Sequence, residues 1–207
     1  MFVGGSETTA TGLEWLMAEL IKNPRVMKKA QEEVRRVVGK KSRIEANDIN
    51  QMEYLKCVIK ENLRLHPPLA LLLPRETSEA VEVGGYEIPA NTRVIINAWA
   101  IQRDPRVWEK PEEFSPERFE NGTVEFKLGH DVELVVFGFG RRGCPGLTFG
   151  VASTELIIAN LLYWFDWELP SKNGVSLRPE DLDMSDSFGL SVCKKVPVYA
   201  VPKLYCP

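Results

Sequence analysis

The chain has 207 residues, of which 44% are hydrophobic and 27% are charged. These fractions are typical of a globular domain with a sizeable core and exclude a disordered chain. The net charge of −3 gives no indication of nucleic acid binding. No uninterrupted apolar run is long enough to cross a bilayer, and no signal peptide is visible.

Cysteine spacing bears on metal and disulfide chemistry. None of the four cysteines forms a C-x-x-C pair, and the two histidines are not at a zinc-type spacing. A domain of this size does not need a disulfide framework. We therefore expect neither a structural zinc site nor disulfides, and a reducing compartment.

The first two elements are predicted helices. Residues 2–22 begin with two glycines and continue with apolar residues at helical spacing. The next helix is capped by Asn23, has Pro24 at its first position and ends at Gly39. Its basic residues form either a solvated face or a surface that docks a partner.

The remaining elements predict a mainly α fold with small β-sheets, of the α+β class. Residues 52–66 form a helix that the following double proline stops. Residues 81–101 read as strand, turn and strand, and 104–119 as irregular chain. Residues 147–165 are apolar nearly all round, which indicates a buried helix, and a strand pair closes the chain.

The stretch 137–146, "FGFGRRGCPG", is the strongest chemical signal. Pro145 suits the first turn of the helix that follows, and this places Cys144 at a helix N-terminus, where a thiolate is stabilised. The glycines would let a flat ligand lie against the backbone, and Arg142 could pair with a carboxylate on it. The alternative is a glycine-rich turn with an inert cysteine. The full stretch favours a haem site with one thiolate ligand.

The same stretch resembles the haem-binding signature of the cytochromes P450, F-x-x-G-x-R-x-C-x-G, at every defined position. The resemblance implies that Cys144 is the axial thiolate of haem b iron, a ligand that favours cleavage of the O–O bond. It implies that Arg142 binds a haem propionate and that Phe137 packs beside the ligand. The residues expected to contact the cofactor are Cys144, Arg142, Arg75, Phe137, Gly138, Gly143 and Gly146.

Other motifs occur along the chain in the same order as in the cytochromes P450. Glu61 and Arg64 in "KENLR", with Arg118 in "PERF", look like its Glu-Arg-Arg triad, a buried charge network behind the haem. Alone, Glu61 and Arg64 would be an ordinary helix pair. Arg75 in "LPRE" resembles a second propionate ligand, and the alternative is a surface arginine.

The segment "GGSETT" resembles the oxygen-activation segment of the family. The resemblance implies that its two glycines leave room for dioxygen, and that Glu7 and Thr8 relay protons to it. The alternative is a helix cap built from Ser6, Thr8 or Thr9.

The resemblance covers residues 1–207 as one partial domain, the C-terminal portion of the cytochrome P450 fold. It implies that the membrane anchor and the regions capping the substrate pocket are absent, that Met1 is an internal methionine and that the chain is a fragment. The segment "INAWAIQRDP" is similar to the corresponding sequence in the plant enzymes of specialised metabolism.

The implied function is a haem-thiolate monooxygenase, which inserts one atom of O2 into a small apolar substrate. Electrons would come from NADPH through NADPH–cytochrome P450 reductase. The full-length protein would be anchored to the endoplasmic reticulum membrane on its cytosolic face. Substrate contacts are expected at Ala70, Leu71, Phe188, Gly189 and Leu190.

Two alternatives remain. A haem-thiolate isomerase or dehydratase would not use O2, and the retained Glu7 and Thr8 argue against it. The second alternative is a truncated, non-catalytic product that binds haem poorly. We expect that the chain alone is not a competent monooxygenase.

Overall fold

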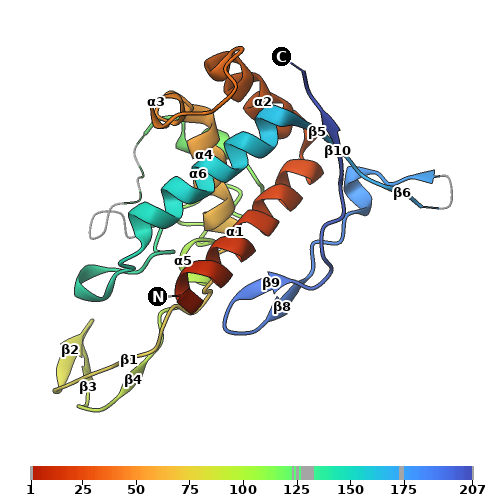
Figure 1. The fold of residues 1–207 in the computed structure, drawn as a ribbon. Helices are drawn as coiled ribbons and strands as arrows, with labels where there is room; N and C mark the ends of the chain where they lie inside the picture. The colour runs from red at the N-terminus through yellow and green to blue at the C-terminus, as the bar shows by residue number, and fades with distance from the viewer. Residues whose placement is uncertain (1, 123, 125, 127–132, 173–174, 207) are drawn as a thin grey trace.

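The computed structural model describes residues 2–206 except 123, 125, 127–132 and 173–174 (Figure 1). The described helices are α1 (Phe2–Lys22), α2 (Pro24–Val38), α3 (Ala46–Ile49), α4 (Glu53–Leu65), α5 (Ala98–Ile101) and α6 (Leu147–Trp164), with 3-10 turns η1 (Pro116–Phe119), η2 (Gly140–Arg142) and η3 (Pro179–Asp181). The strands are β1 (Arg75–Glu76), β2 (Val81–Val83), β3 (Tyr86–Ile88), β4 (Arg93–Val94), β5 (Phe165–Glu168), β6 (Ser171–Lys172), β7 (Val175–Ser176), β8 (Asp186–Phe188), β9 (Val192–Lys194) and β10 (Val201–Leu204). The prediction of an α+β fold with small sheets is confirmed.

The described strands pair into small antiparallel sheets, each with two strands: β1–β4, β2–β3, β5–β10, β6–β7 and β8–β9. The β2–β3 hairpin turns at Gly84 and Gly85, whose φ angles are +58° and +83°. Glycine tolerates these angles because it has no Cβ. The predicted strand-turn-strand is confirmed at 81–88, where in Figure 1 the hairpin projects away from the helices. The rest of the predicted range is different, because β4 pairs with β1 and residues 98–101 form helix α5.

Helices α1, α2, α4 and α6 pack together and hold the core, with α1 and α6 side by side in Figure 1. Leu16 and Leu20 of α1 and Leu162 of α6 are fully buried. Burying one such side chain stabilises the fold by about 1.5–3 kcal/mol. The shared core fixes the direction of α1 relative to α6.

The predicted ends of α2 are confirmed, but the predicted cap by the Asn23 side chain is wrong. Asn23 is its N-cap residue, Pro24 lies at its first position, and Gly39 follows its end with φ +62°. The Asn23 side chain makes no capping hydrogen bond and instead donates to the backbone carbonyl and carboxylate of Glu19 in α1. This amide therefore joins two helices as well as marking a helix start.

Helix α6 departs from the prediction of burial on all sides. Its second half is buried, at Ile158, Ala159 and Leu162, but Phe149 in its first turn is 78% exposed. Among the described residues α6 is the one helix long and apolar enough to cross a membrane by length and composition, although 22% of it is buried within the fold. The sequence does not predict such a segment, because Glu155 interrupts the apolar run of this helix.

A histidine joins the end of α4 to α1. His66, which follows α4, stacks on Trp15 with ring centroids 4.0 Å apart, and its Nε2 lies 2.7 Å from Oε1 of Glu19. Burial lowers the pKa of His66 and outweighs the opposing hydrogen bond to Glu19. The ring is therefore held neutral in the folded protein.

This lowered pKa predicts a loss of stability in mild acid. An unfolded chain takes up a proton on this histidine below its ordinary pKa of 6.5, whereas the folded chain resists. The stabilisation from neutral His66 is therefore present above that value and declines as the pH falls below it. We expect the unfolding temperature of the holoprotein to decrease from about pH 7.5 to about pH 5.5, and to decrease less in His66→Gln. An equal decrease in both proteins would assign the effect to other groups.

Candidate functional site

The Cys144 loop is fixed by its own backbone. The N–H of Cys144 donates to the carbonyl of Phe137 at 2.8 Å, and the N–H of Gly143 donates to that of Gly140 at 3.0 Å. The thiol is free and half-buried, ahead of the first turn of α6. The loop therefore holds one sulfur at the start of a long apolar helix.

The helix begins later than predicted. Gly146 is the N-cap residue and α6 starts at Leu147, so Pro145 lies before the helix and not in its first turn. Gly146 keeps the approach to the thiol open, since a Cβ added there would lie 3.8 Å from the Cys144 Sγ. Cys144 is still near the helix N-terminus, but two residues farther out than a proline at the first position would place it.

Two loop glycines adopt left-handed backbone angles, with φ +70° at Gly138 and +60° at Gly140. A Cβ on Gly138 would lie 3.8 Å from Nη2 of Arg75 and 3.9 Å from the carbonyl of Arg142. A side chain there would be strained by the backbone angle and would enter the space between the two arginine segments.

Arg75 and the loop are joined directly. Arg75, in β1, donates from Nη2 to the carbonyl of Arg142 at 3.2 Å, and the Arg142 side chain is itself exposed. The structure thus brings the guanidinium of Arg75 to the loop of Cys144, although 67 residues separate the two arginines. At this place Arg75 and Arg142, the two arginines predicted to bind haem propionates, could act on the same bound ligand.

Glu61 lies at the centre of the predicted triad and is fully buried, as is Arg64. Arg64 donates to both carboxylate oxygens of Glu61, at 2.7 and 3.0 Å, and Arg118 donates from Nε to Oε1 at 3.0 Å. The backbone N–H of Ser115 adds a donor at 2.8 Å. The three residues therefore form a buried network and not a surface helix pair.

Carbonyl groups satisfy the outer nitrogens of this network. Nη1 of Arg64 donates to the carbonyls of Gln102 and Pro111, each at 2.8 Å, and Nη1 of Arg118 donates to that of Glu109 at 2.9 Å. The Arg64 guanidinium also lies 5.2 Å from the ring centroid of Trp108. The irregular chain around 102–118 is thereby held against α4.

Glu7 and Thr8 lie in the second turn of α1, because this helix starts at Phe2. The alternative of a helix cap built from Ser6, Thr8 or Thr9 is therefore wrong. The Thr8 hydroxyl donates to the carbonyl of Gly4 at 2.7 Å, while the Glu7 carboxylate accepts from the hydroxyl of Ser191. The two side chains occupy adjacent positions and hold different partners.

The predicted substrate contacts fall on two segments. Ala70 is 3% exposed and Leu71 is 42% exposed, after the double proline. Gly189 lies at the tip of the β8–β9 hairpin between Phe188, which is 72% exposed, and Leu190, which is 67% exposed. The N–H of Val192 donates to the carbonyl of Pro68 at 2.9 Å, so the structure does bring the two segments near each other.

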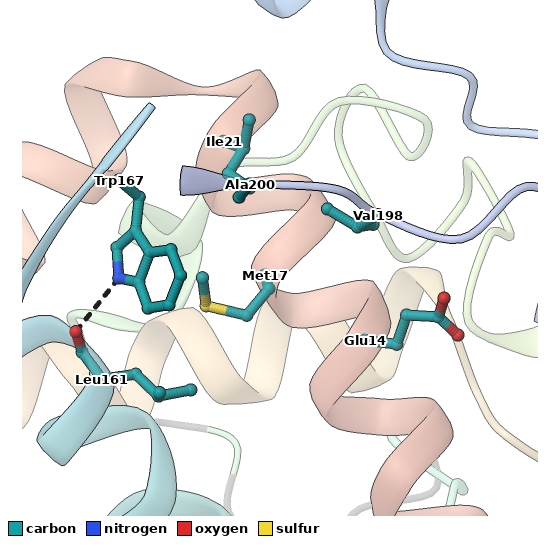
Figure 2. A pocket seen from close by; sticks show the side chains of 7 residues that line it. All are labelled: Glu14, Met17, Ile21, Leu161, Trp167, Val198 and Ala200. Carbon is teal, nitrogen blue, oxygen red and sulfur yellow. Dashed lines mark hydrogen bonds between the residues drawn. The ribbon is translucent and has the colours of Figure 1, made fainter. Parts of the chain in front are cut away.

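A separate apolar cavity of about 240 Å³ lies along the second half of α1 (Figure 2). Trp167 forms one wall and donates from Nε1 to the carbonyl of Leu161 in α6 at 3.0 Å. The residues that line the cavity are Glu14, Met17, Ile21, Leu161, Trp167, Val198 and Ala200. None of the predicted site residues lines it, so this cavity is distinct from the candidate site.

Comparisons with known proteins agree with the motifs. The cytochrome P450 family model matches residues 1–190. Phenylacetaldehyde oxime monooxygenase of Prunus mume is 62% identical over 207 residues, which are 100% of this chain and 39% of that protein. Cytochrome P450 71A1 of Persea americana is 60% identical and is matched over 98% of this chain and 39% of its own length.

A solved structure shows the same fold. A zebrafish cytochrome P450 determined with abiraterone superposes with a TM-score of 0.83 and 29% identity, over 98% of this chain and 46% of that one. The chain belongs to the cytochrome P450 family, of the plant type. It spans 39% of the length of the two curated plant relatives.

Sequence reasoning missed the residues that join distant segments. Ser191 reaches Glu7 across 184 positions, and Thr11 Oγ1 lies 3.3 Å from the Sγ of Cys193. Gln102 donates to the carbonyls of Leu63 and Arg64, at 3.1 and 2.9 Å, at the end of α4. No local pattern marks these polar side chains, because their partners belong to other elements.

The buried network predicts a severe effect of Glu61→Ala. Removing the carboxylate leaves two arginines without their shared anion, at a cost of about 3–5 kcal/mol. Since whole domains are stable by about 5–15 kcal/mol, we expect little soluble holoprotein. Glu53→Ala is the matched control, because Glu53 lies exposed on the same helix. Normal yield and haem content of Glu61→Ala would refute a structural role for the network.

Proposed function

We propose that the longer protein containing this chain is a haem-thiolate monooxygenase that transfers one atom of O2 to an apolar organic substrate. The observation that carries the proposal is the free, half-buried thiol of Cys144 in a glycine loop at the start of α6, in a chain of the cytochrome P450 family. The name of the Prunus mume relative, a phenylacetaldehyde oxime monooxygenase, supports a role in specialised metabolism.

The residues fit a flat cofactor. Gly4 and Gly5 lie in the first turn of α1 and Gly150 lies in the first turn of α6, and a Cβ at any of them would meet no described atom within 4 Å. A glycine within a helix costs up to about 1 kcal/mol relative to alanine. Contacts among the described residues do not explain why glycine occupies these positions despite this cost. A ligand that approaches the helix backbones closely would explain it.

Haem would supply the activation of O2 when bound, and the chain would supply its ligands. Cys144 would hold the iron through its thiolate, which a nearby helix N-terminus stabilises. Arg75 and Arg142 would bind the propionates, since a guanidinium matches a carboxylate geometrically. Phe137, with Gly138, Gly143 and Gly146, would line the face on the side of the sulfur.

Glu7 and Thr8 would deliver protons during the reaction. The Thr8 hydroxyl is oriented by its bond to the carbonyl of Gly4, the first of two adjacent glycines in α1. Glu7 lies one residue away and is exposed, so it can exchange protons with solvent. An alcohol beside a carboxylate is suited to a relay. A role for both groups favours oxygen chemistry over an isomerase or dehydratase.

Membership of the cytochrome P450 family supports a redox partner and a membrane location. We propose that NADPH–cytochrome P450 reductase supplies the electrons, and that the longer protein is held at the endoplasmic reticulum membrane on its cytosolic face. The exposed apolar residues of the β8–β9 tip, Phe188 and Leu190, together with Leu71, would contact a small apolar substrate.

One test of this proposal concerns the ligand of the iron. In the full-length holoenzyme, reduced and bound to CO, we expect the red-shifted Soret band of thiolate-ligated haem, because Cys144 donates a thiolate. Cys144→Ser should abolish that band, whereas Cys206→Ser should not, since Cys206 is a free, exposed cysteine near the chain end. A retained band in Cys144→Ser would remove Cys144 from the iron.

A second prediction concerns proton delivery. Thr8→Ala should leave haem content unchanged but release hydrogen peroxide at the expense of product, because the alcohol of the relay is lost. Product and peroxide formed per NADPH consumed measure this effect. Thr8→Ser retains a hydroxyl and should preserve much of the coupling. Equal coupling in all three proteins would leave Thr8 with a role only in the helix.

A further inference from the structure

Ser191 is a buried hydroxyl that faces the candidate site. Its side chain lies in the turn between β8 and β9 and is 3% exposed. It donates a hydrogen bond to Oε1 of Glu7 in α1. A buried serine whose hydroxyl bonds to a carboxylate makes a charge-assisted hydrogen bond, which is stronger than a neutral one.

Contacts of its neighbours fix the position of Ser191. The carbonyl of Val192 accepts from Nε1 of Trp15 at 2.9 Å, and the N–H of Val192 donates to Pro68 at 2.9 Å. One residue farther on, Cys193 contacts the hydroxyl of Thr11. The backbone beside Ser191 is thus bound to α1 and to the segment after α4, independently of the bond to Glu7.

Glu7 has much less to fix it. Its side chain is largely exposed, and its adjacent residue Thr8 directs its hydroxyl to the backbone of Gly4 and not to Glu7. A glutamate on a helix surface has several rotamers, and ordering them costs conformational entropy. The fixed hydroxyl of Ser191 therefore selects the orientation of the Glu7 side chain.

We propose that Ser191 is a positioning residue for proton delivery, which holds the Glu7 carboxylate in one orientation beside Thr8. This inference rests on the proposed function. It assigns a role in oxygen chemistry to the hairpin that carries the proposed substrate contacts Phe188, Gly189 and Leu190. The hairpin then contributes to the coupling of the reaction as well as to substrate contact.

The test uses the full-length holoenzyme with Ser191→Ala, Ser191→Thr, Glu7→Ala and the double variant Glu7→Ala with Ser191→Ala. We expect Ser191→Ala to lower product per NADPH about two- to tenfold, the range that one hydrogen bond gives. Ser191→Thr retains a hydroxyl and should restore most of the loss. In the Glu7→Ala background, Ser191→Ala should change the coupling no further.

Ser187→Ala is the matched control, because Ser187 is an exposed serine on the same hairpin. It should leave the coupling unchanged. The CO-bound spectrum should be the same in all variants, because Cys144 and its loop are not altered. A loss in Ser191→Ala that Ser191→Thr does not restore, or that persists without Glu7, would overturn the proposal.

Unfolding temperatures give a readout that does not depend on turnover. If Ser191 holds Glu7, the decreases in the two single alanine variants should sum to more than the decrease in the double variant. Additive decreases would contradict the contact. Absence of NADPH-dependent product in the unaltered enzyme would instead contradict the proposed function, and the unfolding cycle would still decide whether Ser191 holds Glu7.

Discussion

The buried carboxylate of Glu61 is the constraint on which the rest of the structure depends. An anion with no exposure is stable inside a protein only when donors surround it. Here the donors come from Arg64 on the same helix, from Arg118 in η1 and from the backbone of Ser115. The chain from 102 to 118 has little regular structure to hold it. The need to neutralise one carboxylate therefore determines where this chain lies.

Helix α4 transmits that order to the candidate site. One residue after Glu61, the Asn62 amide donates to the carbonyl of Gly12 in α1 at 3.0 Å, and beyond the helix end His66 stacks on Trp15 of α1. Trp15 in turn binds the backbone of Val192 beside Ser191. The Glu61 carboxylate and the β8–β9 hairpin are thus connected through α1, which carries Glu7 and Thr8.

Features with local causes could be predicted from the sequence. The turn at Gly84 and Gly85 needs positive φ angles. Helix α2 begins at Pro24, after Asn23, and ends before Gly39. Each of these signals lies within a few residues of the feature it predicts. The family motif also pointed to Glu61, Arg64 and Arg118. The partial exposure of α6 could not be read from its composition, because composition does not say how much apolar surface other elements supply. The bond of Ser191 to Glu7 depends on the path of the chain across 184 positions, which no short pattern encodes.

The placement of glycine distinguishes structural from functional needs in this chain. Glycines at 39, 84, 85, 138 and 140 have positive φ angles, so the backbone itself explains them. Gly4, Gly5 and Gly150 lie within helices, have no such angle and would meet no described atom if they carried a Cβ. Each of these three weakens its helix relative to alanine. They occur in α1 near Thr8 and in α6 after Cys144, on neighbouring helices. The lack of side chains at these places is what the proposed haem would require, if it approaches both helix backbones.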